Sequence, residues 1–150
     1  MKDYIKSLAA LVLSAISSYA VYYVLRILDI VSYFELAEEV DNLQTYCVIV
    51  ISFLLFNFLY GYVLSYSVIK NAILQGSYLL LSGMLFIAFK GNIFIDIFSF
   101  FNLALWELYG IINSNIFVKA IIFIACIAFP VLFSSMGALL SNKMKKKSLS

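Results

Sequence analysis

Long apolar runs separated by short polar segments dominate the chain. Residues 7–28, 46–67 and 116–140 are apolar over at least the length, about 20 residues, that an α-helix needs to cross a bilayer. A fourth run, residues 73–89, is shorter but carries no charged residue. The pattern therefore predicts an all-α integral membrane protein, in which four transmembrane helices form a single bundle over residues 1–150.

A fifth apolar segment, residues 92–114, carries a polar stripe. Polar or small residues recur there every three or four positions, interrupted only by Leu103: Asn92, Asp96, Ser99, Glu107, Gly110 and Ser114. That spacing is typical of one face of an α-helix. It predicts an amphipathic helix between the third and fourth spans. The helix either lies in the outer interface with Asp96, Ser99 and Glu107 toward water, or re-enters the membrane with this face toward protein or a pore.

The positions of the lysines predict an orientation, because basic residues gather on the cytoplasmic side of a membrane. If both termini are cytoplasmic, the outer side holds only Arg26, Lys90 and Lys119. The inner side then holds the other seven basic residues, Lys2, Lys6, Lys70, Lys143, Lys145, Lys146 and Lys147. A fifth crossing at residues 92–115 would separate the two termini and is disfavoured. We therefore expect a protein of the bacterial inner membrane with both termini in the cytoplasm.

Two charged segments are candidate binding surfaces. The basic tail, Lys143, Lys145, Lys146 and Lys147, directly follows the fourth span and is predicted to contact anionic headgroups or a partner protein. An outer acidic surface is predicted between the first two spans, at Glu35, Glu38, Glu39 and Asp41. Those carboxylates do not follow the spacing of a calcium-binding loop, so the sequence predicts a solvated loop and no metal site.

Composition argues against catalysis. The chain is 65% hydrophobic and 12% charged, and it contains no histidine, so imidazole-based nucleophile pairs and metal sites are excluded. Cys47 and Cys126 are solitary, and no nucleotide-binding or hydrolase motif occurs. Asp96 and Glu107 are eleven residues apart, about 16 Å along a helix, which is too far for a catalytic carboxylate pair. We expect neither enzymatic activity nor a cofactor, and the net charge of +2 does not indicate nucleic-acid binding.

The central polar residues of the spans leave two interpretations open. All of them are uncharged, which disfavours a proton-coupled antiporter: Ser14, Ser17, Ser18, Asn57 and Ser82. They either line a pore in an oligomer or, like other small residues, let helices pack closely.

The fourth span contains the only proline of the chain, Pro130. A proline inside a helix removes one backbone donor and predicts a kink. Ser134 and Ser135 are the polar side chains expected to compensate for it. The kink is expected to be static shape or, alternatively, a hinge.

These features predict a non-enzymatic membrane subunit that anchors or signals to a partner protein, soluble or membrane-bound, and that forms a homo-oligomer in the lipid bilayer. The alternative is an oligomeric ion channel or a membrane-perturbing effector. In size and topology, though in no motif, the plan is similar to small membrane subunits of phage-defence complexes and to immunity or superinfection-exclusion proteins. That resemblance implies the membrane sensor or anchor of a bacterial defence or immunity system.

Overall fold

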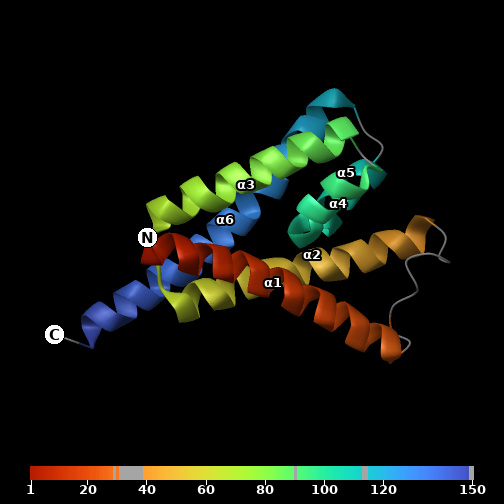
Figure 1. Cartoon of the computed structure of the whole chain (residues 1–150). Coiled ribbons are helices and arrows are strands. Elements are labelled where there is room, and N and C mark those ends of the chain that lie inside the picture. Colours follow the sequence, from red (N-terminus) through yellow and green to blue (C-terminus); the bar gives the residue numbers. More distant parts are fainter. Residues whose placement is uncertain (29, 31–38, 90, 113–114, 149–150) are drawn as a thin grey trace.

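Four long helices build the protein: α1 (Lys2–Ile27), α2 (Glu39–Leu64), α3 (Val68–Phe89) and α6 (Ile116–Lys147) (Figure 1). The computed structural model describes residues 1–28, 30, 39–89, 91–112 and 115–148, and all regular structure within these ranges is helical. All four long helices have the length and apolar composition needed to cross a membrane. The structure thus confirms the prediction of an all-α fold with four membrane-compatible helices.

The helices extend beyond the apolar runs that predicted them. The first helix begins at Lys2 rather than at residue 7, and the last continues to Lys147 rather than ending at residue 140. Hydropathy marks only the apolar part of a helix, whereas backbone hydrogen bonding continues into its polar flanks. The second helix ends earlier than predicted, at Leu64, because Ser65 has a φ of 53°, a left-handed conformation that stops the helix.

The two termini and the turn between α2 and α3 lie at the same end of the bundle, which we call the terminal end (Figure 1). There Lys70 forms an ion pair with Asp3, with Nζ and Oδ2 3.0 Å apart. Lys6 Nζ donates a hydrogen bond to the Ser65 carbonyl at 3.2 Å, and Ser65 Oγ donates one to Asn142 Oδ1 at 2.8 Å. These contacts join the start of α1, the turn and the end of α6.

The helices α2 and α6 touch backbone to backbone. A Cβ atom added to Gly61 would lie 2.1 Å from the Ser134 carbonyl oxygen, and one added to Gly137 would lie 2.0 Å from the Phe58 carbonyl oxygen. Only a residue without a side chain permits such an approach. The two glycines therefore allow α2 and α6 to approach closely on the side of α2 that faces α6.

A helical hairpin enters the bundle from the end opposite the termini. It consists of α4 (Ile93–Phe98), a 3-10 turn η1 (Phe100–Asn102) and α5 (Leu103–Ile111) (Figure 1). Gly91 reverses the chain before it with a φ of 86°. The Phe98 carbonyl reaches Tyr78, midway along α3, and Tyr109 returns to Phe123 near the start of α6. The hairpin thus enters and leaves at the same end.

This hairpin corrects the prediction of one continuous amphipathic helix over residues 92–114. The helix breaks at Ser99, and Ser99 is fully buried although it belongs to the predicted water-facing stripe. Asp96 and Glu107 are partly exposed, on separate helices of the hairpin. The stripe is therefore not a single face, because the turn η1 changes the direction of the chain in its middle.

Candidate functional site

The tip of the hairpin is fixed to α3 by buried polar side chains. With its amide oriented to satisfy its neighbours, Asn102 accepts hydrogen bonds from Ser82 Oγ at 2.8 Å and from Trp106 Nε1 at 2.6 Å. Its Nδ2 donates to the Ser99 carbonyl at 2.8 Å. All four side chains are at least 98% buried. Backbone that leaves helical geometry inside an apolar bundle needs such partners, and one asparagine supplies most of them here.

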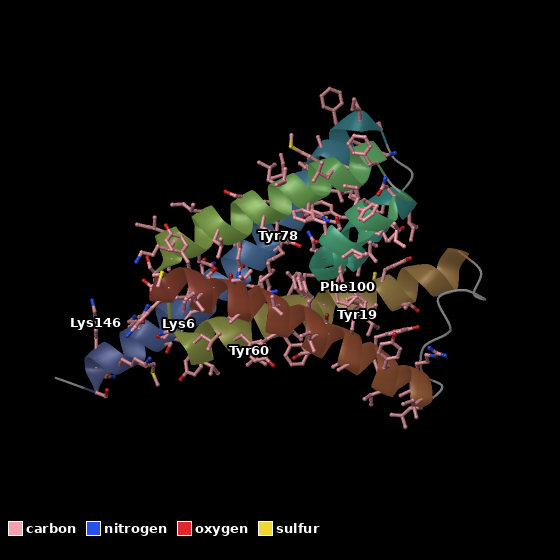
Figure 2. All side chains as sticks on the ribbon, viewed as in Figure 1. Lys6, Tyr19, Tyr60, Tyr78, Phe100 and Lys146 are labelled. Carbon is pink, nitrogen blue, oxygen red and sulfur yellow. The ribbon has the colours of Figure 1, made fainter. Side chains whose placement is uncertain are left out.

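Aromatic side chains of α1 and α3 also contact the tip of the hairpin. Phe100 stacks on Tyr19 of α1, with ring centroids 5.4 Å apart and planes 13° apart. Figure 2 labels both residues. On the other side, the Tyr78 hydroxyl of α3 donates a hydrogen bond to the Phe98 carbonyl. Because these contacts come from two different long helices, the tip is positioned by the bundle and not by α3 alone.

Trp106 anchors the returning helix α5 in the core. It is fully buried, its ring lies against Gly83 of α3, and its centroid is 5.6 Å from that of Phe123 in α6. Beside the tip, a cavity of about 10 Å³ lined by Ser18, Asn102 and apolar side chains has room for about one water molecule. The hairpin is therefore packed against the bundle, and the cavity beside its tip is small.

A second polar region, the amide cluster, joins α1, α3 and α6. It consists of five buried side chains: Ser7, Asn71, Gln75, Ser134 and Ser135. Asn71 Nδ2 donates to Ser134 Oγ at 2.8 Å and to Ser135 Oγ at 2.9 Å, while Asn71 Oδ1 accepts from Ser7 Oγ at 2.7 Å.

Gln75 completes the amide cluster. Its Nε2 donates to the Ser7 carbonyl at 3.0 Å, and its Oε1 accepts from Ser134 Oγ at 3.0 Å. Every side-chain amide atom of Asn71 and Gln75 thus has a partner, and no member of the cluster is charged. Such a cluster fixes how helices pack in an apolar medium, since each polar group would otherwise be left unsatisfied.

Asn57 differs from the amide cluster, although it is equally buried. Its Nδ2 donates to the Phe53 carbonyl of its own helix at 2.9 Å, and its Oδ1 has no hydrogen-bond partner among the described residues. Ser14 and Ser18 also bond to carbonyls within their own helix. Ser17 reaches Tyr60 of α2 at 2.9 Å. Among these four residues, only Ser17 forms a hydrogen bond between two described helices, which fits the packing interpretation. The Asn57 Oδ1 atom is left as a buried acceptor without a described donor.

The terminal end holds a further buried tyrosine. Tyr66 follows Ser65 in the turn, is 2% exposed, and burial raises the pKa of its hydroxyl to about 12. The hydroxyl faces Ser134, which is already engaged with Asn71 and Gln75, and it has no hydrogen-bond partner of normal geometry in the described part of the chain. The Tyr66 carbonyl accepts from Asn142 Nδ2 at 3.3 Å. Tyr66 thus lies on the terminal-end side of the amide cluster, where it contacts Ser134 and Asn142.

The predicted basic tail is helical and exposed. Lys143, Lys145, Lys146 and Lys147 belong to the last turns of α6, which extend past the other helices at the terminal end (Figures 1 and 2). Of the predicted acidic surface, Glu35 and Glu38 lie outside the described residues. Glu39 and Asp41 belong to the first turn of α2, but their side chains lie outside the described part of the chain.

Pro130 lies inside α6, which continues as a helix on both sides of it. Ser134 Oγ lies 3.1 Å from the Val131 carbonyl and shares its single hydrogen between that carbonyl and Gln75 Oε1, so this serine contacts the backbone beyond the proline. Both Ser134 and Ser135, however, also accept hydrogen bonds from Asn71. The sequence did not predict that these two serines hold α3 against α6.

Three further residues of the site escaped the sequence-based prediction: Asn71, Gln75 and Asn102. Asn71 and Gln75 are four residues apart, so they share a helix face at the start of an apolar run. Two amides at that spacing are a signal of interhelical hydrogen bonding, but the predicted third span began at residue 73 and left Asn71 out. Asn102 carried no signal, because its partner Ser82 is distant in sequence.

Comparisons with known proteins give no relative from which a function could be transferred. No known protein family matches the sequence, and no curated protein or solved structure matches the chain. Among the described residues, no group of three or more His, Cys, Asp or Glu side chains is placed to hold a metal ion.

Proposed function

We propose that the protein is a non-enzymatic integral membrane subunit that anchors a partner protein or signals to it, with α1, α2, α3 and α6 crossing the bilayer. The observation that carries the proposal is the separation of charge along the bundle. Among the described residues, Asp3 is the only acidic residue at the terminal end. The same end holds Lys2, Lys6, Lys70, Lys143, Lys145, Lys146 and Lys147. This lysine-rich end faces the cytoplasm by the positive-inside rule.

The basic tail is the surface best placed for a partner. At 1.5 Å per residue the 32 residues of α6 span about 48 Å, whereas the hydrocarbon core of a bilayer is about 30 Å thick. The last turns of α6 therefore protrude into the cytoplasm as a rigid basic helix. A soluble partner with an acidic surface complements it, and the same lysines attract anionic lipid headgroups.

A route for signalling runs along α6. The helix touches α2 at Gly137, holds α3 through Ser134, and meets the hairpin where Cys126 Sγ lies 3.7 Å from the Leu105 carbonyl. A partner that displaces the basic tail therefore acts on a helix in direct contact with the hairpin at the other end. This continuity supports signalling as well as anchoring.

Recovery of a partner from cells tests the proposal. The tagged protein, solubilised in mild detergent, is compared with a variant in which Lys143, Lys145, Lys146 and Lys147 are replaced by Gln, and with a charge-preserving variant carrying Arg at the same four positions. We expect a soluble protein to co-purify with the original chain and the Arg variant, and to be lost with the Gln variant. Equal recovery by all three, or no co-purifying protein, contradicts the proposal.

The re-entrant hairpin favours a second candidate, an oligomeric ion channel. Non-helical backbone at membrane depth is tolerated where it is buried in protein or lines a water-filled cavity, and Asn57 offers an unused buried acceptor. The purified protein in liposomes with an ion-sensitive dye tests this candidate. A channel requires ion flux whose selectivity changes in Asp96→Asn or Glu107→Gln. Sealed liposomes remove this candidate and leave the anchoring role.

A further inference from the structure

A groove between α2 and α6 leads directly to the basic tail. It has a volume of about 610 Å³ and is lined by Phe58, Met136, Leu139, Leu140 and Lys143. The lining is apolar except for the lysine ammonium. We propose that this groove binds a phospholipid with an anionic headgroup, which places one acyl chain along the apolar lining and its phosphate at Lys143. The inference rests on the membrane placement proposed above, but not on a protein partner.

The groove exists because the two helix backbones touch. At Gly61 and Gly137 no side chain fills the space between the helices, so the larger side chains on either side stand out as walls. Phe58 forms the wall on α2, and Met136 and Leu140 form the wall on α6. Both of these α6 side chains are about half exposed, so the groove is open to the surrounding lipid.

The order of side chains along α6 matches the order of groups in a phospholipid. Met136, Leu140 and Lys143 are spaced by four and three residues and therefore share one face of the helix. Lys143 lies about 10 Å nearer the cytoplasm than Met136, given the 1.5 Å rise per residue. Lys143 forms no hydrogen bond or ion pair within the described part of the chain, so its ammonium is available to a phosphate.

The charge of Lys143 favours a lipid over a second copy of the chain as the occupant of the groove. Copies in one membrane share the same orientation, so two of these grooves facing each other would bring the two Lys143 side chains together. Like charges at that position repel, whereas an anionic headgroup neutralises them. The groove faces the bilayer over its apolar length, which a soluble acidic protein does not reach. An anionic phospholipid complements both the apolar lining of the groove and the Lys143 ammonium.

Native mass spectrometry of the delipidated full-length protein tests the site, using phosphatidylglycerol and phosphatidylcholine with identical acyl chains. We expect one phosphatidylglycerol to bind more tightly than phosphatidylcholine. Lys143→Gln should weaken phosphatidylglycerol binding about fivefold, the factor that corresponds to about 1 kcal/mol for one lysine at the headgroup level. Leu140→Trp, which fills the groove, should weaken both lipids, because it blocks the acyl chain.

Lys145→Gln is the matched control. It removes the same charge from the same tail, but Lys145 is two residues from Lys143 and so lies about 200° around the helix. Its binding should equal that of the original protein. Equal losses in the two Gln variants, no preference for phosphatidylglycerol, or a dimer without bound lipid would each overturn the proposal. Recovery of a soluble partner by Leu140→Trp, measured separately, shows whether the anchoring role depends on the lipid.

Discussion

Asn71 Nδ2 lies 2.8 Å from Ser134 Oγ and joins α3 to α6 one turn beyond Pro130. The contact is buried, and the same amide group also reaches Ser135, while its oxygen accepts from Ser7. One side chain thus satisfies hydroxyl groups from two other helices. Loss of the Asn71 side chain therefore removes a partner from three hydroxyl groups, those of Ser7, Ser134 and Ser135.

Replacing Asn71 by Ala should therefore destabilise the bundle by about 1–3 kcal/mol, the range for leaving buried polar groups unsatisfied, although single hydrogen bonds in membranes average nearer 0.6 kcal/mol. Reversible unfolding in mixed micelles measures the change in unfolding free energy. Ser77→Ala serves as the control, because Ser77 is on the same helix but exposed. If the two variants unfold with the same free energy, the amide cluster does not stabilise the packing.

Gly83 and Gly76 provide a matched pair on α3. A Cβ atom at Gly83 would lie 2.5 Å from a ring carbon of Trp106, whereas one at Gly76 would have no atom within 4 Å. Gly83→Ala should cost about 1–3 kcal/mol, because the buried ring must move. Gly76→Ala should leave stability unchanged or raise it, since alanine is the better helix former. Thermal unfolding in detergent checks both variants, and equal melting temperatures would contradict the position of the Trp106 ring.

The hairpin predicts which residues a reagent reaches from outside. In a background with Cys47→Ser and Cys126→Ser, Asn92→Cys should react quickly with a membrane-impermeant thiol reagent, because residue 92 is exposed. Ser99→Cys should stay protected, because residue 99 is fully buried at the hairpin tip. A single interfacial helix makes the opposite prediction, with both positions labelled at similar rates.

The orientation of the bundle is tested with reporter fusions. A reporter after Ser150 should be active only in the cytoplasm, and one inserted at Asn42, between α1 and the apolar part of α2, only outside. Both results follow from the seven lysines at the terminal end. Activity on the opposite side at either site would overturn the proposed placement of the four long helices.

The long helices were predictable because their cause is local. An apolar run of sufficient length can satisfy its backbone in a membrane only as a helix, so residues 7–28 predicted α1 without knowledge of its neighbours. The break at Ser99 was not predictable in this way. A three- and four-residue repeat indicates a continuous helix, whereas the turn there depends on Ser82 and Asn102, which are twenty residues apart.

The same distinction applies to the serines after Pro130. The sequence predicted that they would compensate for the backbone donor missing at Pro130. The carbonyl that loses this donor is that of Cys126, whereas Ser134 contacts the Val131 carbonyl, so the compensating role stays a prediction. What the sequence did not reveal was that Asn71, more than sixty residues earlier, uses both Ser134 and Ser135. The lysine positions, in contrast, were informative without any knowledge of packing, because they predict which helix ends lie on the same side of the membrane.

The order of the helices, with α6 made after α1, α2 and α3, has a consequence for biosynthesis. When a ribosome has completed only the first three helices, Asn71 still lacks the serines of α6, and Trp106 and Phe123 have not yet been made. The nascent protein therefore passes through a stage in which two amides on α3 face lipid or the translocation machinery. We expect chains truncated at residue 115 to be degraded quickly in a pulse-chase experiment, because Asn71 Nδ2 and Gln75 Oε1 then lack Ser134 and Ser135 and only their contacts with Ser7 remain. Synthesis of α6 is thus the step that completes the polar contacts of α3.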